Sequence, residues 1–251
     1  MNITSKNTVG EVAVVFPGTI RVFEQHHIDY CCSGDQSIAQ ACAKQGLTVD
    51  AVIGELRRAS QVEDSRYTGE TPEANVPNWA ETSLTELVYH ILGTHHQYLA
   101  RELPRLRQML SKVIDVHGDE HPESLTPLGQ VFDALEAELA SHMMKEERIL
   151  FPLIQDMETT KEKGTPLPEF GCGSVNNPIR VMEHEHDNAG NALLEIRRLT
   201  DDHTPPEDAC NTYRALFRGF HALEQDLHQH IHLENNILFP RAAVLEAELI
   251  S

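Results

Sequence analysis

The sequence has few aromatic residues, few basic residues and no long apolar run. Only 6% of its 251 residues are aromatic, and it contains one tryptophan. Lysine and arginine together number 20, against 39 aspartates and glutamates, which gives a formal net charge of −19. Nucleic acids and anionic membrane surfaces attract basic patches, so this balance argues against either as a partner. No apolar run approaches the roughly 20 residues of a transmembrane helix, so we expect no membrane segment.

Cysteine is also scarce, and its spacing excludes a common use. The five cysteines are an odd number and include no Cys-x-x-Cys pair. Such a set does not resemble the disulfide framework of a secreted protein. Residues 1–18 have no basic segment and only a short apolar run, unlike a secretory signal peptide. We therefore expect a protein of the reducing cytoplasm.

A repeated motif is the clearest positive feature of the sequence. A histidine is followed four residues later by a glutamate, at His142 and Glu146 and again at His230 and Glu234, and each copy ends in Ile-Leu-Phe-Pro. Corresponding residues of the two copies are 88 positions apart. Because residues i and i+4 share one face of a helix, each pair points at a single spot.

Both His-Glu pairs interrupt an apolar stripe that should face a protein core. Leucines precede and follow each pair at helical spacing. A buried carboxylate without a partner is costly, and a metal ion is the usual reason to bury one. A solvent-exposed pair is the alternative, and it would be ordinary for a single instance. Two instances within core stripes favour a metal site.

Composition divides the chain into three parts. Residues 1–60 contain short helical segments and the adjacent cysteines Cys31 and Cys32; residues 61–82 are polar, contain prolines and lack periodicity, which is typical of a linker. Residues 83–251 contain long segments with helical periodicity. We expect an all-α protein, with a small helical N-terminal domain followed by a four-helix bundle.

Four short helices are predicted in the first part, over about residues 8–15, 19–26, 36–45 and 49–58. Gly46 should end the third helix, because a residue in the left-handed conformation commonly follows the last turn of a helix. Thr48 should cap the fourth helix.

Cys31 and Cys32 lie in the loop before the third helix. Their α-carbons are only about 3.8 Å apart, too close for an unstrained disulfide. Thiols ahead of a helix N-terminus could have lowered pKa values and act as reactive or ligating thiolates; buried small residues are the alternative.

Four long helices are predicted in the third part, over about residues 83–113, 126–157, 178–199 and 207–248. The first and third carry His96 and His186 in their apolar stripes, and the second and fourth carry the His-Glu motifs. Two helix pairs joined by the loop 158–177 thus repeat, as in a four-helix bundle with pseudo-twofold symmetry. Pro104 should kink the first helix, and Pro152 should kink the second or end its regular part.

Six side chains should converge in this bundle: His96, His142, Glu146, His186, His230 and Glu234. They are too many for a tetrahedral zinc site, and they suit two metal ions, each held by two histidines, with both glutamates and a solvent-derived oxygen as bridges. Nitrogen and oxygen donors favour iron, with manganese second. His95 competes with His96 for the first position. Glu183 and Asp187 could hydrogen-bond to ligand imidazoles.

These motifs resemble the iron–sulfur cluster repair di-iron proteins, the RIC family, over nearly the whole chain. Val9-Gly10-Glu11 and Ile28–Cys32 resemble the small N-terminal domain of that family. Four blocks resemble its hemerythrin-like domain: Leu103–Leu106, His142–Glu147, Glu185–Gly190 and Asp226–Asn236. The turn Ser33-Gly34-Asp35 departs from the more glycine-rich turn we expect of the family, and the loop with Cys172 is a second departure with no assigned role.

The resemblance implies a cytoplasmic stress protein with a non-haem di-iron centre. It would restore iron–sulfur clusters damaged by nitric oxide or oxidants, so its partners would be proteins that carry damaged clusters. The family's histidine ligands fall on His96, His142, His186 and His230, and its bridging carboxylates fall on Glu146 and Glu234. The resemblance thus favours His96 over His95, and it places the family's cysteine pair on Cys31 and Cys32.

Three functions remain open on these grounds. The first is a repair factor whose two iron ions are labile enough to be donated to damaged clusters. The second is nitric oxide binding or reduction at the di-iron centre, with Cys31 and Cys32 relaying electrons or receiving the nitrosyl. The third is a hemerythrin-like sensor or store of dioxygen, for which vicinal thiols are not needed. Whether the chain is an enzyme, and whether it forms a homodimer, are left open.

Overall fold

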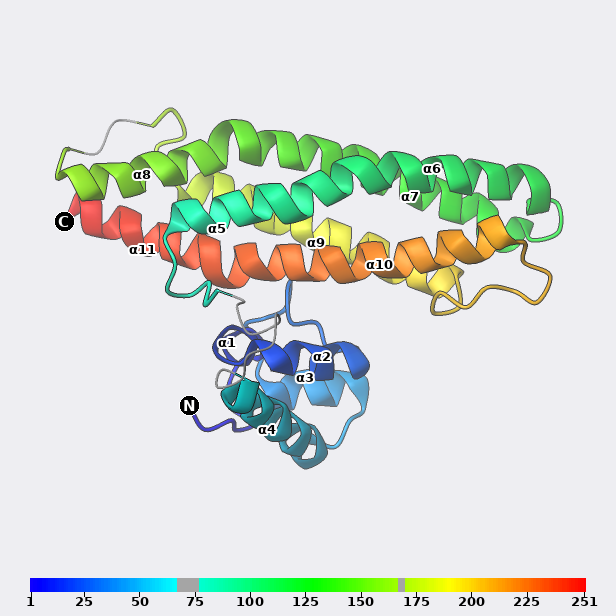
Figure 1. Ribbon diagram of the computed structural model, residues 1–251, viewed down its shortest axis with the longest axis horizontal. Coiled ribbons are helices and arrows are strands. Elements are labelled where there is room, and N and C mark those ends of the chain that lie inside the picture. The colour runs from blue at the N-terminus through cyan, green and yellow to red at the C-terminus, as the bar shows by residue number, and fades with distance from the viewer. Residues whose placement is uncertain (67–76, 167–169) are drawn as a thin grey trace. The chain divides into compact units, whose positions relative to one another are not determined.

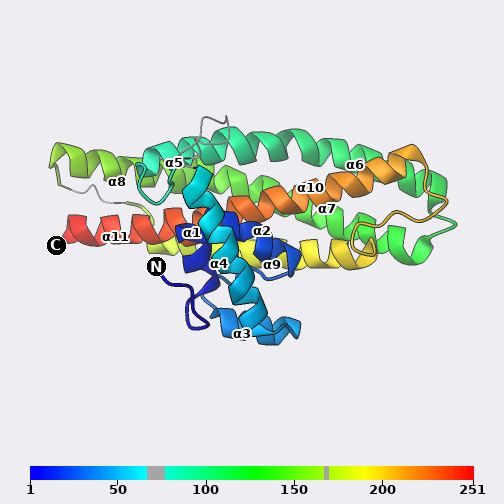
Figure 2. The same cartoon turned by 60° about the horizontal axis from the view of Figure 1, so that its bottom comes forward.

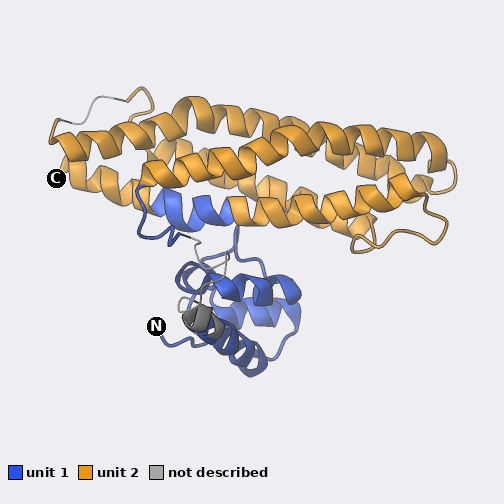
Figure 3. Cartoon of the chain, in the orientation of Figure 1, with its two compact units in different colours: residues 1–83, 231–240 blue, residues 84–230, 241–251 orange. Residues whose placement is uncertain are grey.

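A computed structural model of the chain describes residues 1–66, 77–166 and 170–251, with side chains up to residue 61 in the first range. Every named element within these ranges is helical, which confirms the predicted all-α class. None of the helices described is both long and apolar enough to cross a membrane. The chain forms two compact units: residues 1–83 with 231–240, and residues 84–230 with 241–251 (Figure 3).

The N-terminal part of the first unit consists of short helices: α1 (Val9–Val15), the 3-10 turn η1 (Pro17–Thr19), α2 (Ile20–Gln25), α3 (Ile38–Gln45) and α4 (Val49–Arg66). Reciprocal side-chain caps start α1 at Thr8 and α3 at Ser37. Gly46 ends α3 in the left-handed conformation with φ of 68°, as predicted. Buried apolar side chains of all four helices, with Tyr30, form one core.

Helix α4 is longer than predicted. It continues to Arg66 instead of ending near residue 58, and so enters the stretch 61–82 predicted as a linker. Polar composition alone does not distinguish the exposed face of a helix from a linker. Residues 67–76 of that stretch lie outside the described residues.

Four long helical segments run side by side in alternating directions (Figures 1 and 2). The elements in chain order are α5 (Leu84–Ile91), η2 (Leu92–His96), α6 (Gln97–His117), α7 (Pro122–Lys145), η3 (Glu146–Leu150), α8 (Phe151–Lys163), α9 (Asn176–Leu199), α10 (Asn211–Leu233), η4 (Glu234–Leu238) and α11 (Phe239–Ile250). Helix α7 packs on α6 and α9, and α5 packs on α8. The predicted leucine stripes form the buried core between these helices.

Three of the four segments contain a π-helical turn, namely η2, η3 and η4. Pro152 and Pro240 each follow such a turn by two residues. A proline cannot donate a backbone hydrogen bond, and its ring clashes with the carbonyl four residues earlier. That carbonyl lies within the wider turn in both cases, so the helix changes its winding there and continues. Helix α6 likewise continues through Pro104.

The connection between the two helix pairs is shorter than predicted. Helix α8 extends to Lys163 and α9 begins at Asn176, whereas the sequence suggested a loop over residues 158–177. Gly164, with φ of 61°, ends α8 in the left-handed conformation that favours glycine. Residues 167–169 of the connection lie outside the described residues.

Candidate metal centre

The structure brings all six predicted side chains together in two overlapping groups. One group is His96, Glu146, His230 and Glu234; the other is His142, Glu146, His186 and Glu234. Within each group the ligand atoms lie within 4.8 Å of one another. The six residues are at most 4% exposed. Both groups share the two glutamates.

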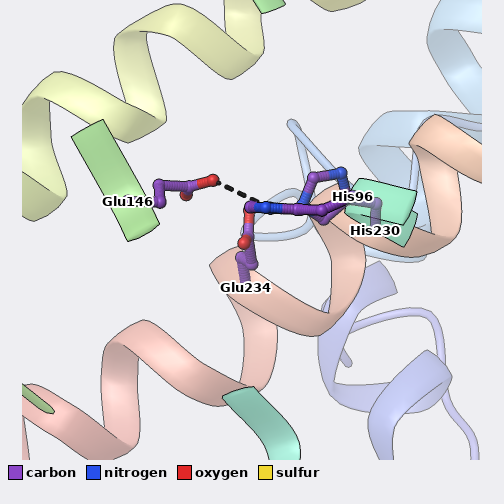
Figure 4. Close-up of side chains that lie close together, drawn as sticks. All are labelled: His96, Glu146, His230 and Glu234. Carbon is purple, nitrogen blue, oxygen red and sulfur yellow. Dashed lines mark ion pairs between the residues drawn. The ribbon is translucent and has the colours of Figure 1, made fainter. Parts of the chain in front are cut away.

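Glu146 lies between histidines of the two groups. Its Oε2 atom is 3.3 Å from Nε2 of His96 and 3.2 Å from Nε2 of His142. The Nε2 atom of His142 is also 3.1 Å from Nε2 of His186. Several donor atoms thus converge on one small volume, and Figure 4 shows Glu146 and Glu234 directed toward His96 and His230. Nitrogen and oxygen donors at this density, without a thiolate, suit iron or manganese.

The π-helical turns coincide with this cluster. Glu146 is the first residue of η3, Glu234 is the first residue of η4, and His96 is the last residue of η2. A π turn inserts one extra residue into a helix, which rotates the following side chains relative to the preceding ones. Such turns occur frequently at functional sites. Here the π turn lets the helix direct a candidate ligand side chain at the cluster, while the apolar side chains after the turn still face the core.

Two carboxylates contact the Nδ1 atoms of candidate ligand imidazoles. Oε1 of Glu147 lies 2.9 Å from Nδ1 of His96, and Oε2 of Glu185 lies 3.0 Å from Nδ1 of His142. Burial opposes ionisation of Glu185, but the Lys145 and His142 side chains outweigh it and lower the pKa of Glu185. An ionised carboxylate at Nδ1 keeps the proton there and leaves Nε2 free to bind a cation.

Glu147 and Glu185 were missed by the sequence interpretation, which suggested Glu183 and Asp187 for this role. Each of the two observed carboxylates is adjacent to a predicted ligand, since Glu147 follows Glu146 and Glu185 precedes His186. Each nevertheless contacts an imidazole on a different helix from its own. The only sign of this role in the sequence was therefore that each carboxylate is adjacent to a predicted ligand. The packing of the helices decides which imidazole each carboxylate contacts.

His95 is buried beside the cluster without belonging to either group. Its Nδ1 atom lies 3.0 Å from Oδ1 of Asp226. Its ring stacks on the ring of His230, with centroids 5.4 Å apart and planes inclined by 4°. The two groups contain His96 instead. His95 thus restrains the orientation of the His230 ring.

The cysteine pair of the first unit lies against Asp29. Oδ1 of Asp29 accepts hydrogen bonds from the backbone N–H groups of Cys31 and Cys32, at 3.1 and 2.9 Å, and from the Cys31 thiol at 3.3 Å. Both cysteines are free thiols, with Sγ atoms 3.7 Å apart; Cys31 is buried and Cys32 is partly exposed.

Of the two alternatives for these thiols, a lowered pKa and a buried small residue, the surroundings of Cys31 favour the second. The adjacent Cys32 thiol, burial and the carboxylate of Asp29 raise the pKa of Cys31. The dipole of α3 does not offset them, because that helix begins only at Ile38, one loop later. Cys32 is the more accessible of the two thiols.

Within the first unit, the cysteine loop is hydrogen-bonded to the segment 231–240. Nδ2 of Asn235 donates to the carbonyl of Cys31 at 3.2 Å, and Nδ2 of Asn236 donates to the carbonyl of Tyr30 at 3.1 Å. The Asn236 amide also lies 3.0 Å from Nδ1 of His232. Burial lowers the pKa of His232 to about 4, so its ring is neutral and can accept that hydrogen bond.

Two glycines make this contact possible. A Cβ atom on Gly10 or on Gly34 would lie 2.5 Å from Oδ1 of Asn236. The N–H of Gly10 also donates to the carbonyl of Gly34 at 2.8 Å. Gly34 lies in the turn where the sequence comparison suggested more glycine. The structure shows that one glycine at this position admits the Asn236 side chain.

Comparison with known proteins agrees with this geometry. Residues 87–242 match the hemerythrin HHE cation binding domain, and residues 5–60 match the ScdA_N domain, described as a domain of unknown function (DUF542). The chain is 39% identical over 235 residues to the iron-sulfur cluster repair protein YtfE of Dickeya chrysanthemi, covering 94% of this chain and 96% of that protein.

The protein of the same name from Yersinia pseudotuberculosis is also 39% identical, over 236 residues, with the same coverage of both chains. These matches confirm the resemblance drawn from the motifs. A hemerythrin-like domain is a non-haem iron-binding domain, which agrees with the donor set in the bundle. The chain therefore belongs to the family of iron–sulfur cluster repair proteins, with an N-terminal ScdA_N domain and a hemerythrin-like helical bundle.

Proposed function

We propose that the bundle binds two iron ions, with Glu146 and Glu234 as bridging carboxylates. One ion is held by His96 and His230, and the other by His142 and His186. The observation that carries this proposal is the membership of both glutamates in both four-residue groups. A single ion would not need two overlapping groups of donors.

The donor set fits non-haem iron. Four imidazoles and two carboxylates supply borderline and hard donors, which suit iron better than the thiolates of a structural zinc site do. When bound, the iron pair supplies redox chemistry and exchangeable coordination positions. The role of the chain is to hold the donors in one protonation state, through Glu147 at His96 and Glu185 at His142.

We further propose that repair proceeds by supplying iron to the damaged cluster. Binding by imidazole and carboxylate depends on protonation, because each donor must lose its proton to bind a cation. Glu147 is half exposed although the His96 ring that it holds is buried. Solvent can reach the Glu147 carboxylate, and loss of its contact with Nδ1 of His96 would weaken the hold on that ring. Iron held in this way can be retained at rest and released to a recipient.

The test is Mössbauer spectroscopy with metal analysis on iron-57-labelled protein, before and after incubation with a cluster-free iron–sulfur protein under reducing conditions. We expect two coupled iron ions per chain at the start, and loss of labelled iron as the recipient's cluster forms. Absence of a coupled pair would overturn the assignment of the centre. Two coupled ions that remain while the recipient stays empty would overturn iron supply alone.

Nitric oxide chemistry is the second candidate, favoured by the adjacent thiols of Cys31 and Cys32. Their Sγ atoms are 3.7 Å apart and Cys32 is partly exposed, so the pair could relay electrons or receive the nitrosyl. Consumption of nitric oxide without loss of iron would favour this candidate. Replacing both cysteines by alanine should leave the iron spectrum intact and impair repair; a changed iron spectrum would contradict separate roles.

A further inference from the structure

A second cluster of metal-binding side chains lies at the end of the bundle formed by the connections 118–121 and 200–210, away from α5, α8 and α11 (Figures 1 and 2). His117 is the last residue of α6, Glu120 follows it in the first connection, and Asp208 lies in the second. One ligand atom from each of the three lies within 4.8 Å of the other two. None of them belongs to the centre described above.

His117 is nine-tenths buried, with 8% of its surface exposed. Within the described part of the chain, neither of its ring nitrogens has a hydrogen-bond partner of standard geometry. Oε2 of Glu120 lies 3.5 Å from Nδ1, and the ring packs on Tyr213 with centroids 5.4 Å apart. A buried imidazole whose nitrogens have only loose contacts, here with Glu120 and Cys210, is costly, and a cation is one way to satisfy it.

The Cys210 thiol lies next to His117. It lies immediately before α10, and its sulfur accepts hydrogen bonds from the backbone N–H groups of Tyr213 and Thr212. These hydrogen bonds, together with the His117 ring, lower the pKa of Cys210 to about 7. The Cys210 side chain, ahead of Glu120, in turn raises the pKa of His117. A helix N-terminus commonly stabilises a thiolate in this way.

We propose that His117, Glu120, Asp208 and Cys210 form a second cation site, which binds a divalent first-row transition ion such as zinc or iron(II). One imidazole, one thiolate and two carboxylates are the donors of a four-coordinate site for such ions. The ion lies at the bundle end and ties the end of α6 to the start of α10.

Three of the four side chains already lie close together, and the exposed Cys210 side chain, which lies outside that group of three, has to turn toward the ion. Two ligand atoms about 2.1 Å from a tetrahedral ion lie about 3.4 Å apart, and His117 and Glu120 are already at 3.5 Å. The side chains of Glu120 and Asp208 are 64% and 54% exposed, so both can turn toward an ion. His121, whose Nε2 atom lies 3.2 Å from Oδ2 of Asp208, can orient that carboxylate.

Another histidine cluster in the bundle lacks these properties. His203, His221 and Glu224 also lie close together. Both oxygens of Glu224, however, accept hydrogen bonds, from Arg197 at 2.7 Å and from His203 at 2.9 Å. A cation would have to displace the Arg197 guanidinium, so this cluster is a structural ion-pair network.

The test is titration of the iron-loaded full-length protein with Co²⁺, whose binding to a thiolate produces a sulfur-to-cobalt charge-transfer band. We expect one Co²⁺ per chain, a charge-transfer band and displacement by Zn²⁺. Cys210→Ser should abolish the band and raise the Kd for Co²⁺ at least about tenfold, as expected when a direct ligand is lost. Asp208→Asn should weaken binding and keep the band.

Controls separate this site from the other thiols and from the iron centre. Cys172→Ser removes a partly exposed cysteine elsewhere and should leave the titration unchanged, as should the double variant Cys31→Ser with Cys32→Ser. An unaltered Kd in Cys210→Ser would overturn the proposal. So would a band that persists in Cys210→Ser and is lost in the Cys31 and Cys32 variant, or Co²⁺ uptake that only replaces iron.

Discussion

The two copies of the internal repeat use the same position for different purposes. Glu147 in the first copy and Asn235 in the second are 88 residues apart, and each follows a shared glutamate of the metal centre. Glu147 contacts the ring of His96, whereas Asn235 donates to the carbonyl of Cys31. The residues that both copies share thus face the candidate metal centre. The residues that differ contact different parts of the chain, namely His96 in the first copy and the cysteine loop in the second.

A second difference lies farther along the bundle. Arg107 pairs with Glu136 in the first copy, and Arg197 pairs with Glu224 in the second, again with the two glutamates 88 residues apart. The Glu136 side chain is 18% exposed, while that of Glu224 is 3% exposed and also accepts a hydrogen bond from His203. The same pair is therefore a surface contact in one copy and a buried network in the other.

The largest expected effect tests what the copies share. Glu146→Ala and Glu234→Ala should each lower the iron content below two ions per chain, because each removes a donor from both four-residue groups. Metal analysis with Mössbauer spectroscopy measures this. Glu138→Ala, at an exposed position of α7, is the matched control and should retain the iron. Two coupled ions in both bridge variants would contradict the bridging role.

The next prediction concerns the position at which the two copies differ, Glu147 in the first and Asn235 in the second. Glu147→Gln should weaken iron binding about 10- to 100-fold, the usual cost of losing a carboxylate that orients a ligand imidazole. Asn235→Ala, at the corresponding position of the second copy, should change iron affinity far less. Competition with a chelator measures both. Equal losses of affinity would show that the two positions do not differ in function.

The buried ion pair should contribute more stability than its exposed counterpart. Glu224→Gln should lower the free energy of unfolding by about 1.5–3 kcal/mol at neutral pH, and Glu136→Gln by about 0–1 kcal/mol. Burial opposes ionisation of Glu224, but His203 and Arg197 outweigh it and hold its pKa below 4.5. The ionised Glu224 therefore stabilises the folded protein. This contribution to the free energy of unfolding is fully present above pH 4.5, and it is lost as the pH falls through the lower pKa that Glu224 has in the folded protein.

Denaturant unfolding at neutral pH and below pH 4 measures this difference. The difference in the free energy of unfolding between the wild-type protein and Glu224→Gln should decrease as the pH falls, because protonation of Glu224 removes the same negative charge that the substitution removes. A gap that stays constant with pH would mean that Glu224 stabilises the bundle by packing and not by charge.

The glycine contact should have an effect no larger than that of the buried ion pair. Gly34→Ala places a methyl group 2.5 Å from Oδ1 of Asn236 and should cost about 1–3 kcal/mol. Gly54→Ala is the matched control, because its methyl group meets only the Arg58 side chain at 3.6 Å within a helix. It should stabilise α4 by about 0.5–1 kcal/mol. Limited proteolysis of residues 1–60 in both variants measures the change; equal behaviour would argue against a close fit at Gly34.

Local patterns in the sequence account for the helices and for the candidate metal ligands. Apolar periodicity and caps such as Thr8 and Gly46 depend on neighbours a few residues away, so these elements were predictable. The i,i+4 spacing of His142 and Glu146, repeated 88 residues later, placed donors on one face of each helix.

Contacts between distant segments were decided only by the tertiary structure. Which carboxylate reaches which imidazole depends on how helices pack, so Glu185 could not be assigned to His142 beforehand. The raised pKa of Cys31 results from burial and from its neighbours in the folded loop. His117 and Cys210 are 93 residues apart and meet only because α6 ends and α10 begins at the same end of the bundle. Sequence periodicity specifies the faces of helices, and the packing of those faces specifies the sites.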